Sequence, residues 1–283
     1  MTDAERAYAA AQAVARAADG LSATFARQLS TVLRETERQL RPVLEAAEAG
    51  SATAVVKAAR ANRTRRGIRA VLERAGFSDM ADVATGSALD VIVERVLASR
   101  DALDVPIDES TASQIAALKA LQTTDLLDAG DGLARDLWQA TIRGVFASRP
   151  VDEILADLAD VMDGTEAQIR TVYDTSVSIF GRQVEALHAG DDPETVFVYM
   201  GPADSKTRPF CREHVGKVYT RADIDALDNG QLDNVFLTGG GYNCRHIWQE
   251  VSKFSTLMDL LGTDQRVPEV EDQIQRIPTK KAA

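Results

Sequence analysis

Soft metal ligands are concentrated in one short part of this chain. Its two cysteines, Cys211 and Cys244, and two of its three histidines, His214 and His246, lie between residues 211 and 246. Thiols and imidazoles gathered in a chain that has no other cysteine predict a small module held together by a metal ion or by a disulfide. This stretch is therefore where the function is best sought.

The spacing of these four residues favours a structural zinc site. Cys211-x-x-His214 is a chelating spacing, because a tight turn can direct both side chains at one ion. Cys244 and His246 are two residues apart, and on a strand such residues point to the same face. Two thiolates and two imidazoles would complete a tetrahedral zinc site without an open position for water. Two other interpretations stay open: a Cys211–Cys244 disulfide, or two buried thiols with surface histidines.

Net charge limits the partners of the chain as a whole. The formal charge is −11 and the isoelectric point is about 4.9, so nucleic acid and anionic membranes should repel most of its surface. No apolar run approaches 18 residues, and the N-terminus has no signal-peptide pattern. We therefore expect a soluble protein made in the cytoplasm, where a structural disulfide is the less common use of two cysteines.

The first 190 residues are predicted to be helical. Few aromatics and abundant alanine favour closely packed helices, and apolar residues recur at three- and four-residue steps. The long helix over 3–48 should be kinked or divided at Pro42. Further helices are expected over 52–75, 87–100, 108–145 with an interruption at Gly130–Gly132, 150–164 and 165–187, with a loop over 78–86.

The pattern changes after residue 190. Residues 195–200 are β-branched and aromatic, which is typical of a strand. Short candidate strands follow at 235–237 and 244–251, with helices expected at 221–227 and 252–261. We expect a mainly α fold, in which residues 1–190 form a helical domain for docking and 191–262 form a small α+β module. Residues 263–283 are expected to be an extended or disordered tail.

One basic segment stands out in this acidic chain. Between residues 57 and 74 the only acid is Glu73, and the segment contains Lys57, Arg60, Arg63, Arg65, Arg66, Arg69 and Arg74. It is the one place where DNA or an acidic protein could dock. The alternative is a solvated helix face that pairs with acids of neighbouring helices.

No catalytic constellation is evident in the sequence. The run Asp204-Ser-Lys-Thr-Arg208 has the composition of a turn and helix cap, with Arg208 able to form a forked pair with an acid. Gly239-Gly-Gly241 lacks the residues of a phosphate loop and favours a close backbone approach. We therefore expect a protein that is not an enzyme.

The C-terminal motifs resemble a known family. They are Tyr199-Met-Gly-Pro202, Asp204-x-x-Thr207-Arg208-x-x-Cys211, His214-x-Gly216-Lys217 and Asn243-Cys244-Arg245. Over residues 165–251 this order resembles the tailed-phage minor head proteins of the Mu-F-type head-morphogenesis family. The chain departs from that pattern in the glycine run before Asn243 and in His246, where a second cysteine is common. Because histidine keeps the capacity to bind a soft metal, this exchange fits a metal site better than a disulfide.

The resemblance implies a low-copy component of the virion, made in the host cytoplasm and bound inside the phage head near the portal vertex. Its partners would be the portal protein or the major capsid protein, with a contact to packaged DNA during genome packaging or ejection. It implies neither a membrane nor a small-molecule substrate. Two alternatives are a metal-dependent nuclease or toxin-like effector, and a DNA-binding packaging accessory that uses the basic segment.

Overall fold

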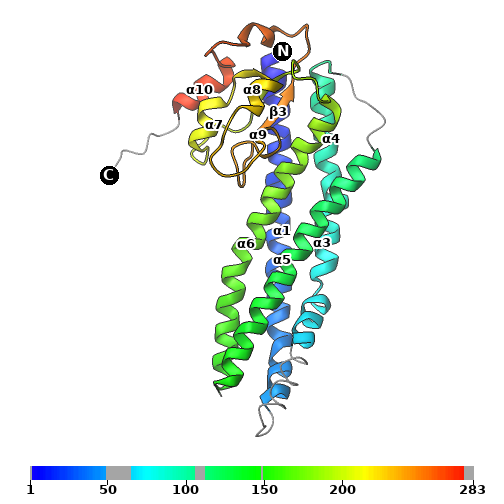
Figure 1. Ribbon diagram of the computed structural model, residues 1–283, viewed down its shortest axis with the longest axis vertical. Coiled ribbons are helices and arrows are strands. Elements are labelled where there is room, and N and C mark those ends of the chain that lie inside the picture. The colour runs from blue at the N-terminus through cyan, green and yellow to red at the C-terminus, as the bar shows by residue number, and fades with distance from the viewer. Residues whose placement is uncertain (1, 49–64, 106–111, 148, 277–283) are drawn as a thin grey trace, which may run out of the picture. The chain divides into compact units, whose positions relative to one another are not determined.

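Helices and a small antiparallel sheet form the computed structural model, which describes residues 2–48, 65–105, 112–147 and 149–276 (Figure 1). The expected class, mainly α with a small α+β part near the C-terminus, is confirmed. The longer helices are α1 (Asp3–Glu48), α3 (Phe77–Thr85), α4 (Asp90–Ala102), α5 (Ala112–Phe146), α6 (Val151–Ala189) and α10 (Pro268–Arg276). The shorter elements are η1 (Ser87–Leu89), β1 (Val196–Met200), α7 (Pro209–His214), β2 (Val218–Thr220), α8 (Arg221–Asp225), α9 (Val235–Thr238), β3 (Ile247–Glu250) and η3 (Thr256–Leu260). Among the described residues, no helix is both long enough and apolar enough to cross a membrane.

The chain forms two compact units that do not follow the boundary expected near residue 190. Unit 1 contains residues 1–21, 87–120 and 174–283, and unit 2 contains residues 22–86 and 121–173. Helices α1, α5 and α6 each contribute residues to both units. The Cys/His region therefore shares its compact unit with segments from the N-terminal half of the chain.

Unit 2 consists of helical segments whose side chains pack closely. Phe25 on α1 stacks on Tyr173 of α6, with ring centroids 4.0 Å apart. Gly130 lies in the middle of α5, where an added Cβ would overlap the ring of Phe77. The expected interruption at Gly130–Gly132 is wrong for this reason: the glycine lets an aromatic ring approach an unbroken helix.

Other expected helix boundaries in this region are also wrong. Helix α1 keeps its expected bounds and is not divided at Pro42, while the kink expected there stays a prediction. Helix α6 continues through Gly164 to Ala189, so the expected boundary at residues 164–165 is wrong. Residues 78–86, expected to form a loop, lie mostly in helix α3. Packing of the long helices outweighs the local cost of proline and glycine, which is a few kcal/mol at most.

Unit 1 is built around a three-stranded antiparallel sheet of order β2-β1-β3. The central strand β1 is buried along its whole length, as expected for its apolar sequence. Val198 pairs with Val218 on one side and with Gln249 on the other. The sheet thus brings the residues around 200, 218 and 248 together.

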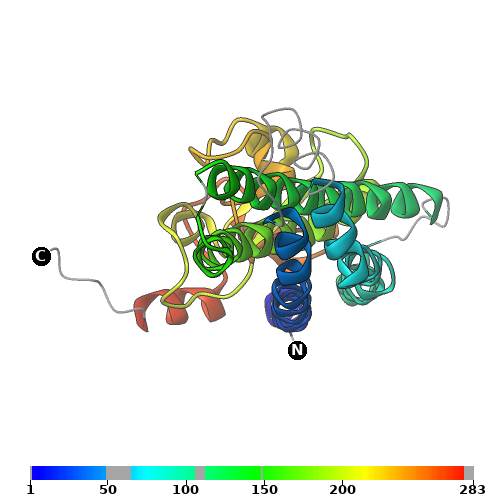
Figure 2. The same ribbon diagram turned by 90° about the horizontal axis from the view of Figure 1, so that it is seen from below.

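Several short elements of unit 1 differ from the expectation. Residues 235–237 form helix α9 instead of a strand, because Asn234 caps the N–H of Leu237. Residues 268–276 form helix α10, where an extended tail was expected, and Tyr8 of α1 hydrogen-bonds Gln273 at 2.7 Å. Figure 2 views this first part of α1 nearly end-on. The strand over 195–200 and the helix from 221 are confirmed.

Candidate metal centre

Cys211, Cys244 and His246 form one buried cluster in unit 1. Cys211 comes from α7, Cys244 from the turn after the glycine run, and His246 from the residue before β3. Their ligand atoms lie within 4.8 Å of one another, and the three residues are only 2–3% exposed. The sulfur atoms of the two cysteines are 3.8 Å apart, and Cys244 Sγ is 3.9 Å from His246 Nδ1.

This geometry fits a metal ion. Two metal–sulfur bonds of about 2.3 Å at a tetrahedral angle place the sulfur atoms about 3.8 Å apart. The separation of Cys211 Sγ and Cys244 Sγ has this value, and both cysteines are free thiols. The cluster could therefore hold a metal ion with two sulfur donors and one nitrogen donor.

His214 does not belong to the cluster, contrary to the expected four-residue site. It ends helix α7, and its Nδ1 lies 2.6 Å from the hydroxyl of Tyr219 on β2. Its ring also packs against Phe210, at a centroid distance of 4.4 Å. Burial lowers the pKa of His214, which favours the neutral imidazole in this contact. The chelating spacing was misleading because Cys211 and His214 lie on a short helix and not on a tight turn.

Cys244 and His246 reach the cluster in a way that the sequence did not indicate. Both precede β3, so the argument from alternate strand residues does not apply to them. The buried guanidinium of Arg182 holds this segment from α6. Its Nε donates to the carbonyl of Leu237 at 2.5 Å, and its Nη1 donates to those of His246 at 2.7 Å and Cys244 at 3.4 Å.

Glycines give the backbone room to approach the thiols. A Cβ on Gly240 would overlap Cys211 Sγ, and the N–H of Gly240 donates to Cys244 Sγ at 3.1 Å. A Cβ on Gly201 would lie 2.6 Å from the ring of His246. The glycine run therefore makes the close backbone approach that its sequence favoured.

The two thiols have opposite proton affinities. The hydrogen bond between them raises the pKa of Cys211 and lowers that of Cys244. Burial opposes the lowering at Cys244, while His246 and Arg182 support it. The pair thus favours one thiolate on Cys244, which is the form of cysteine that binds metals.

Asp204, Thr207 and Arg208 hold the loop before α7. The carboxylate of Asp204 accepts from Arg245 at 2.6 Å and from the N–H of Lys206 at 2.9 Å, as expected for a turn residue. Thr207 donates its hydroxyl to the carbonyl of Pro202 at 2.8 Å. Arg208 donates to the side chain of Gln231 and the carbonyl of Gly240, and it forms no ion pair with an acid of the described residues.

Asn243 joins the loop of Cys244 to helix α6. Its backbone N–H donates to Thr175 Oγ1 at 3.1 Å, and its side-chain oxygen accepts from the same hydroxyl at 3.2 Å. Its φ of 53° is a left-handed value that asparagine tolerates better than most residues. This pair of bonds orients the turn that leads into Cys244.

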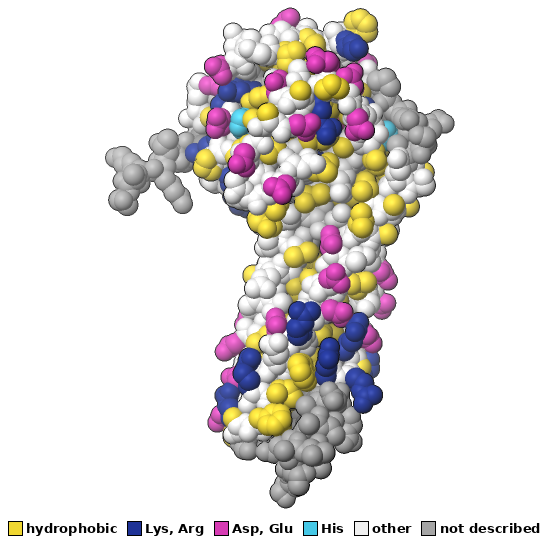
Figure 3. Space-filling model, viewed as in Figure 1, with side chains coloured by type: hydrophobic (Ala, Val, Ile, Leu, Met, Phe, Trp, Pro, Cys, Tyr) yellow, Lys and Arg dark blue, Asp and Glu magenta, His cyan; other side chains and the backbone are white. Residues whose placement is uncertain are grey.

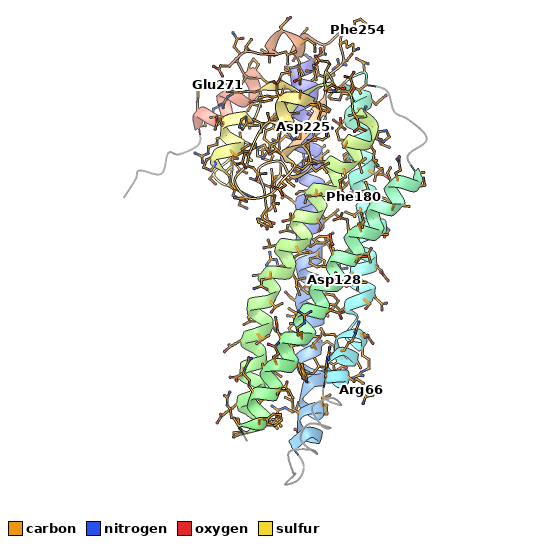
Figure 4. The ribbon with its side chains drawn as sticks, viewed as in Figure 1. Arg66, Asp128, Phe180, Asp225, Phe254 and Glu271 are labelled. Atoms are coloured by element: carbon orange, nitrogen blue, oxygen red, sulfur yellow. The ribbon has the colours of Figure 1, made fainter. Side chains whose placement is uncertain are left out.

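The basic segment is described only in part. Lys57, Arg60 and Arg63 lie outside the described residues, whereas Arg65, Arg66 and Arg69 lie on a helix of unit 2. These three line a cavity of about 570 Å³ with Asp131, Ala134 and Arg135 of α5. Figure 3 shows Lys and Arg side chains gathered in the part of the molecule where Figure 4 labels Arg66.

Acids and an aromatic ring contact two of these arginines. Arg69 pairs with Asp131 at 3.2 Å and with Glu73 at 3.6 Å. The guanidinium of Arg65 lies 5.5 Å from the centre of the Trp138 ring. Pairing with neighbouring acids therefore accounts for part of the basic segment, and an arginine-lined cavity remains.

Two residues of the site were missed by the sequence analysis. Arg182 is 1% exposed, although an arginine in an amphipathic helix is usually assigned to the solvent face. Tyr199 is fully buried, and its hydroxyl lies 3.3 Å from Cys244 Sγ and 3.6 Å from Cys211 Sγ. Tyr199 was named only as the first residue of a family motif and not as a donor, and no local signal marked Arg182.

No family model matches the chain, and searches of curated proteins and of solved structures give no match.

Proposed function

We propose that this protein is a minor head protein of a tailed phage, bound in few copies at the portal vertex or the inner capsid wall and acting in head assembly. The resemblance to the Mu-F-type family suggests the role. One structural observation supports the proposal. The residues of the motifs that resemble this family contact other residues of the same chain, around a single buried cluster. Such use of the motif suits an architectural unit better than a substrate site.

The contacts of the motif support this view in detail. Asp204 pairs with Arg245, Arg208 binds the carbonyl of Gly240, and Asn243 is bonded to Thr175. The motif therefore ties the loop before α7 to the glycine run and to α6. A surface supported in this way can be rigid, as a component of a symmetric particle requires.

The metal in this unit is, in our proposal, one structural zinc held by Cys211, Cys244 and His246. Two thiolates and an imidazole are typical zinc donors in proteins. The three side chains are almost completely buried, which is typical of an ion that stabilises a fold. A nuclease or toxin-like effector would instead need a metal that substrate and water can reach.

Intact particles provide the test of the assembly role. We expect cryo-electron microscopy of particles from the phage that encodes this chain to show its density at the portal vertex. Quantitative mass spectrometry of the same particles should give far fewer copies than the major capsid protein, which serves as the internal reference. Absence from purified particles, or an even distribution over the shell, would overturn the proposal.

A second candidate function is contact with packaged DNA through unit 2. The arginine-lined cavity favours it, because phosphates bind most readily where guanidinium groups converge. Binding of short duplex DNA should weaken steeply with salt and should fall further in an Arg66→Ala/Arg135→Ala variant. The matched control is Arg38→Ala/Arg170→Ala, which removes two arginines that do not line the cavity. Equal binding by both variants would remove this candidate.

A further inference from the structure

Tyr199 is placed where a fourth donor of the metal centre would be. Its hydroxyl lies 3.3 Å from Cys244 Sγ and 3.6 Å from Cys211 Sγ. Its ring stacks on that of His246, with centroids 5.2 Å apart and an angle of 21°. A tetrahedral ion with metal–oxygen bonds of about 2.0 Å and metal–sulfur bonds of about 2.3 Å places these atoms about 3.5 Å apart. The two observed distances lie on either side of that value.

The surroundings of Tyr199 fix its position. It lies on the central strand β1 and is fully buried. The rings of Trp248 and Phe210 also contact it, at centroid distances of 4.3 and 6.2 Å. The phenol therefore has little freedom to turn away from the thiols.

The charge of Arg182 gives a second and independent argument. Its guanidinium is buried and donates only to backbone carbonyls, and within the described residues no carboxylate forms an ion pair with it. Zinc with two thiolates and a neutral imidazole has no net charge, so Arg182 would leave one uncompensated positive charge in the interior. A third anionic donor would remove that charge, and buried uncompensated charges are costly.

Two buried nitrogen atoms also indicate an incomplete site. Among the described residues, Nη2 of Arg182 and Nε2 of His246 have no hydrogen-bond partner. Buried polar groups are usually bonded, so such atoms around one cluster call for an explanation. An anionic centre held by the cluster would attract the Arg182 guanidinium and would polarise the imidazole of His246.

We propose that the Tyr199 phenolate is the fourth donor of the zinc centre and closes it with Cys211, Cys244 and His246. This inference rests on the zinc of the proposed function. When the ion binds, the O–H bond of Tyr199 and the S–H bond of Cys211 break, both protons pass to solvent, and the phenolate oxygen and the two thiolates form bonds to zinc. The resulting Zn(S)₂(N)(O) centre has one negative charge, which Arg182 balances.

The alternative role for Tyr199 is that of a hydrogen-bond donor to the thiolates. The same distances would serve it, but the phenol would keep its proton. A phenol has an ordinary pKa of about 10, so Tyr199 keeps its proton at neutral pH unless an ion displaces it. The two roles therefore differ in whether zinc creates a tyrosinate.

Near-ultraviolet difference spectroscopy distinguishes them. The full chain is stripped with a chelator and titrated with zinc at neutral pH, and the tyrosinate absorption is followed. We expect the signal of one tyrosinate per chain at saturation, out of five tyrosines. Tyr199→Phe should abolish this signal and weaken zinc binding by about tenfold or more. The control Tyr219→Phe removes the tyrosine that contacts His214 and should keep the signal.

Each outcome decides one point. Stoichiometric zinc binding without a tyrosinate signal would overturn the role of Tyr199 and leave the zinc site in place. A signal that persists in Tyr199→Phe would also overturn it. If zinc does not bind at all, the metal part of the proposed function fails together with this inference. Should Tyr199→Phe not fold, a wild type without a tyrosinate signal still overturns the role of Tyr199, and a signal that persists in Tyr219→Phe supports it.

Discussion

Among the described residues of unit 1, two arginines are buried, Arg100 and Arg182, and their charges are compensated in different ways. Arg100 on α4 is 2% exposed and donates to Glu185 and to Glu250, both at 2.8 Å. Arg182 on α6 is 1% exposed and, within the part of the chain that the structure describes, donates only to the carbonyl oxygens of Leu237, Cys244 and His246. The first cation is therefore neutralised by carboxylates of the fold itself, and the second faces a pair of thiols.

The two arginines differ in whether carboxylates neutralise their positive charge. A buried arginine with two acids links three elements and has no charge left for a ligand. A buried arginine with carbonyls alone keeps its positive charge, and it favours an anion beside it. Arg100 thus links three elements of the fold, whereas Arg182 favours a thiolate on Cys244 in a cluster that could hold a metal ion.

The largest effect is expected at Arg100. Arg100→Met leaves Glu185 buried without its partner, so the free energy of unfolding of unit 1 should fall by about 3–5 kcal/mol. Urea unfolding can be followed by Trp248 in a Trp138→Phe background, because the chain has only these two tryptophans. The loss should be the same with zinc and with chelator.

A second substitution tests the cause of that loss. Arg100→Met/Glu185→Met removes both buried charges and should recover most of the stability, because a well-packed apolar pair can replace a buried ion pair. If the double variant is no more stable than Arg100→Met, the burial of an unpaired Glu185 carboxylate is not the reason for the loss of stability.

Removal of zinc should have the next largest effect. A ligand at a concentration about 100 times its Kd stabilises the folded state by about 2.7 kcal/mol, so a chelator should remove that amount from unit 1. Cys244→Ser should unfold at the same urea concentration with and without zinc, whereas His214→Ala should keep the zinc dependence. A wild-type protein that is indifferent to chelator would contradict a structural ion.

Arg182 should affect the metal more than the fold. Arg182→Met removes the donor to the carbonyls of Cys244 and His246 together with its charge, so zinc affinity should fall by about 10- to 100-fold. Competition with a chromophoric chelator measures this change. Arg100→Met is the matched control, because it removes the other buried arginine and should leave zinc affinity within about threefold of wild type. An equal loss in both variants would mean that the two arginines act alike.

Much of this fold could be predicted from the sequence, because its signals are local. Apolar periodicity identified the helices of the first half, and the run Val196–Met200 identified the central strand. Helix boundaries failed at Gly130 because the close contact of Phe77 comes from a distant part of the chain. No local pattern contains such a contact.

The candidate site was predictable to a similar extent. Cysteine and histidine content located Cys211, Cys244 and His246, since soft ligands are rare in this chain. Spacing alone wrongly included His214, whose orientation depends on Tyr219 of another element. Arg182 was missed because the burial of a charged helix residue depends on tertiary packing. The role of Tyr199 on β1 was missed because its contacts with the two thiols join distant parts of the chain.

The smallest effect is expected at a third arginine, Arg245, whose partner Asp204 is 42% exposed. Burial tends to raise the pKa of Asp204, but the bonds from Arg245 and from the N–H of Lys206 hold it below its ordinary value of 3.8. A carboxyl whose pKa is lowered by folding stabilises the fold above its unfolded pKa and loses this contribution as the pH falls.

Asp204→Asn should therefore cost about 1 kcal/mol or less near neutral pH, because solvent screens a half-exposed pair. The difference from wild type should shrink as the pH falls through 3.8, when urea unfolding is measured in chelator so that metal loss does not contribute. A difference that grows on acidification would mean that the pair with Arg245 does not favour the ionised carboxylate of Asp204.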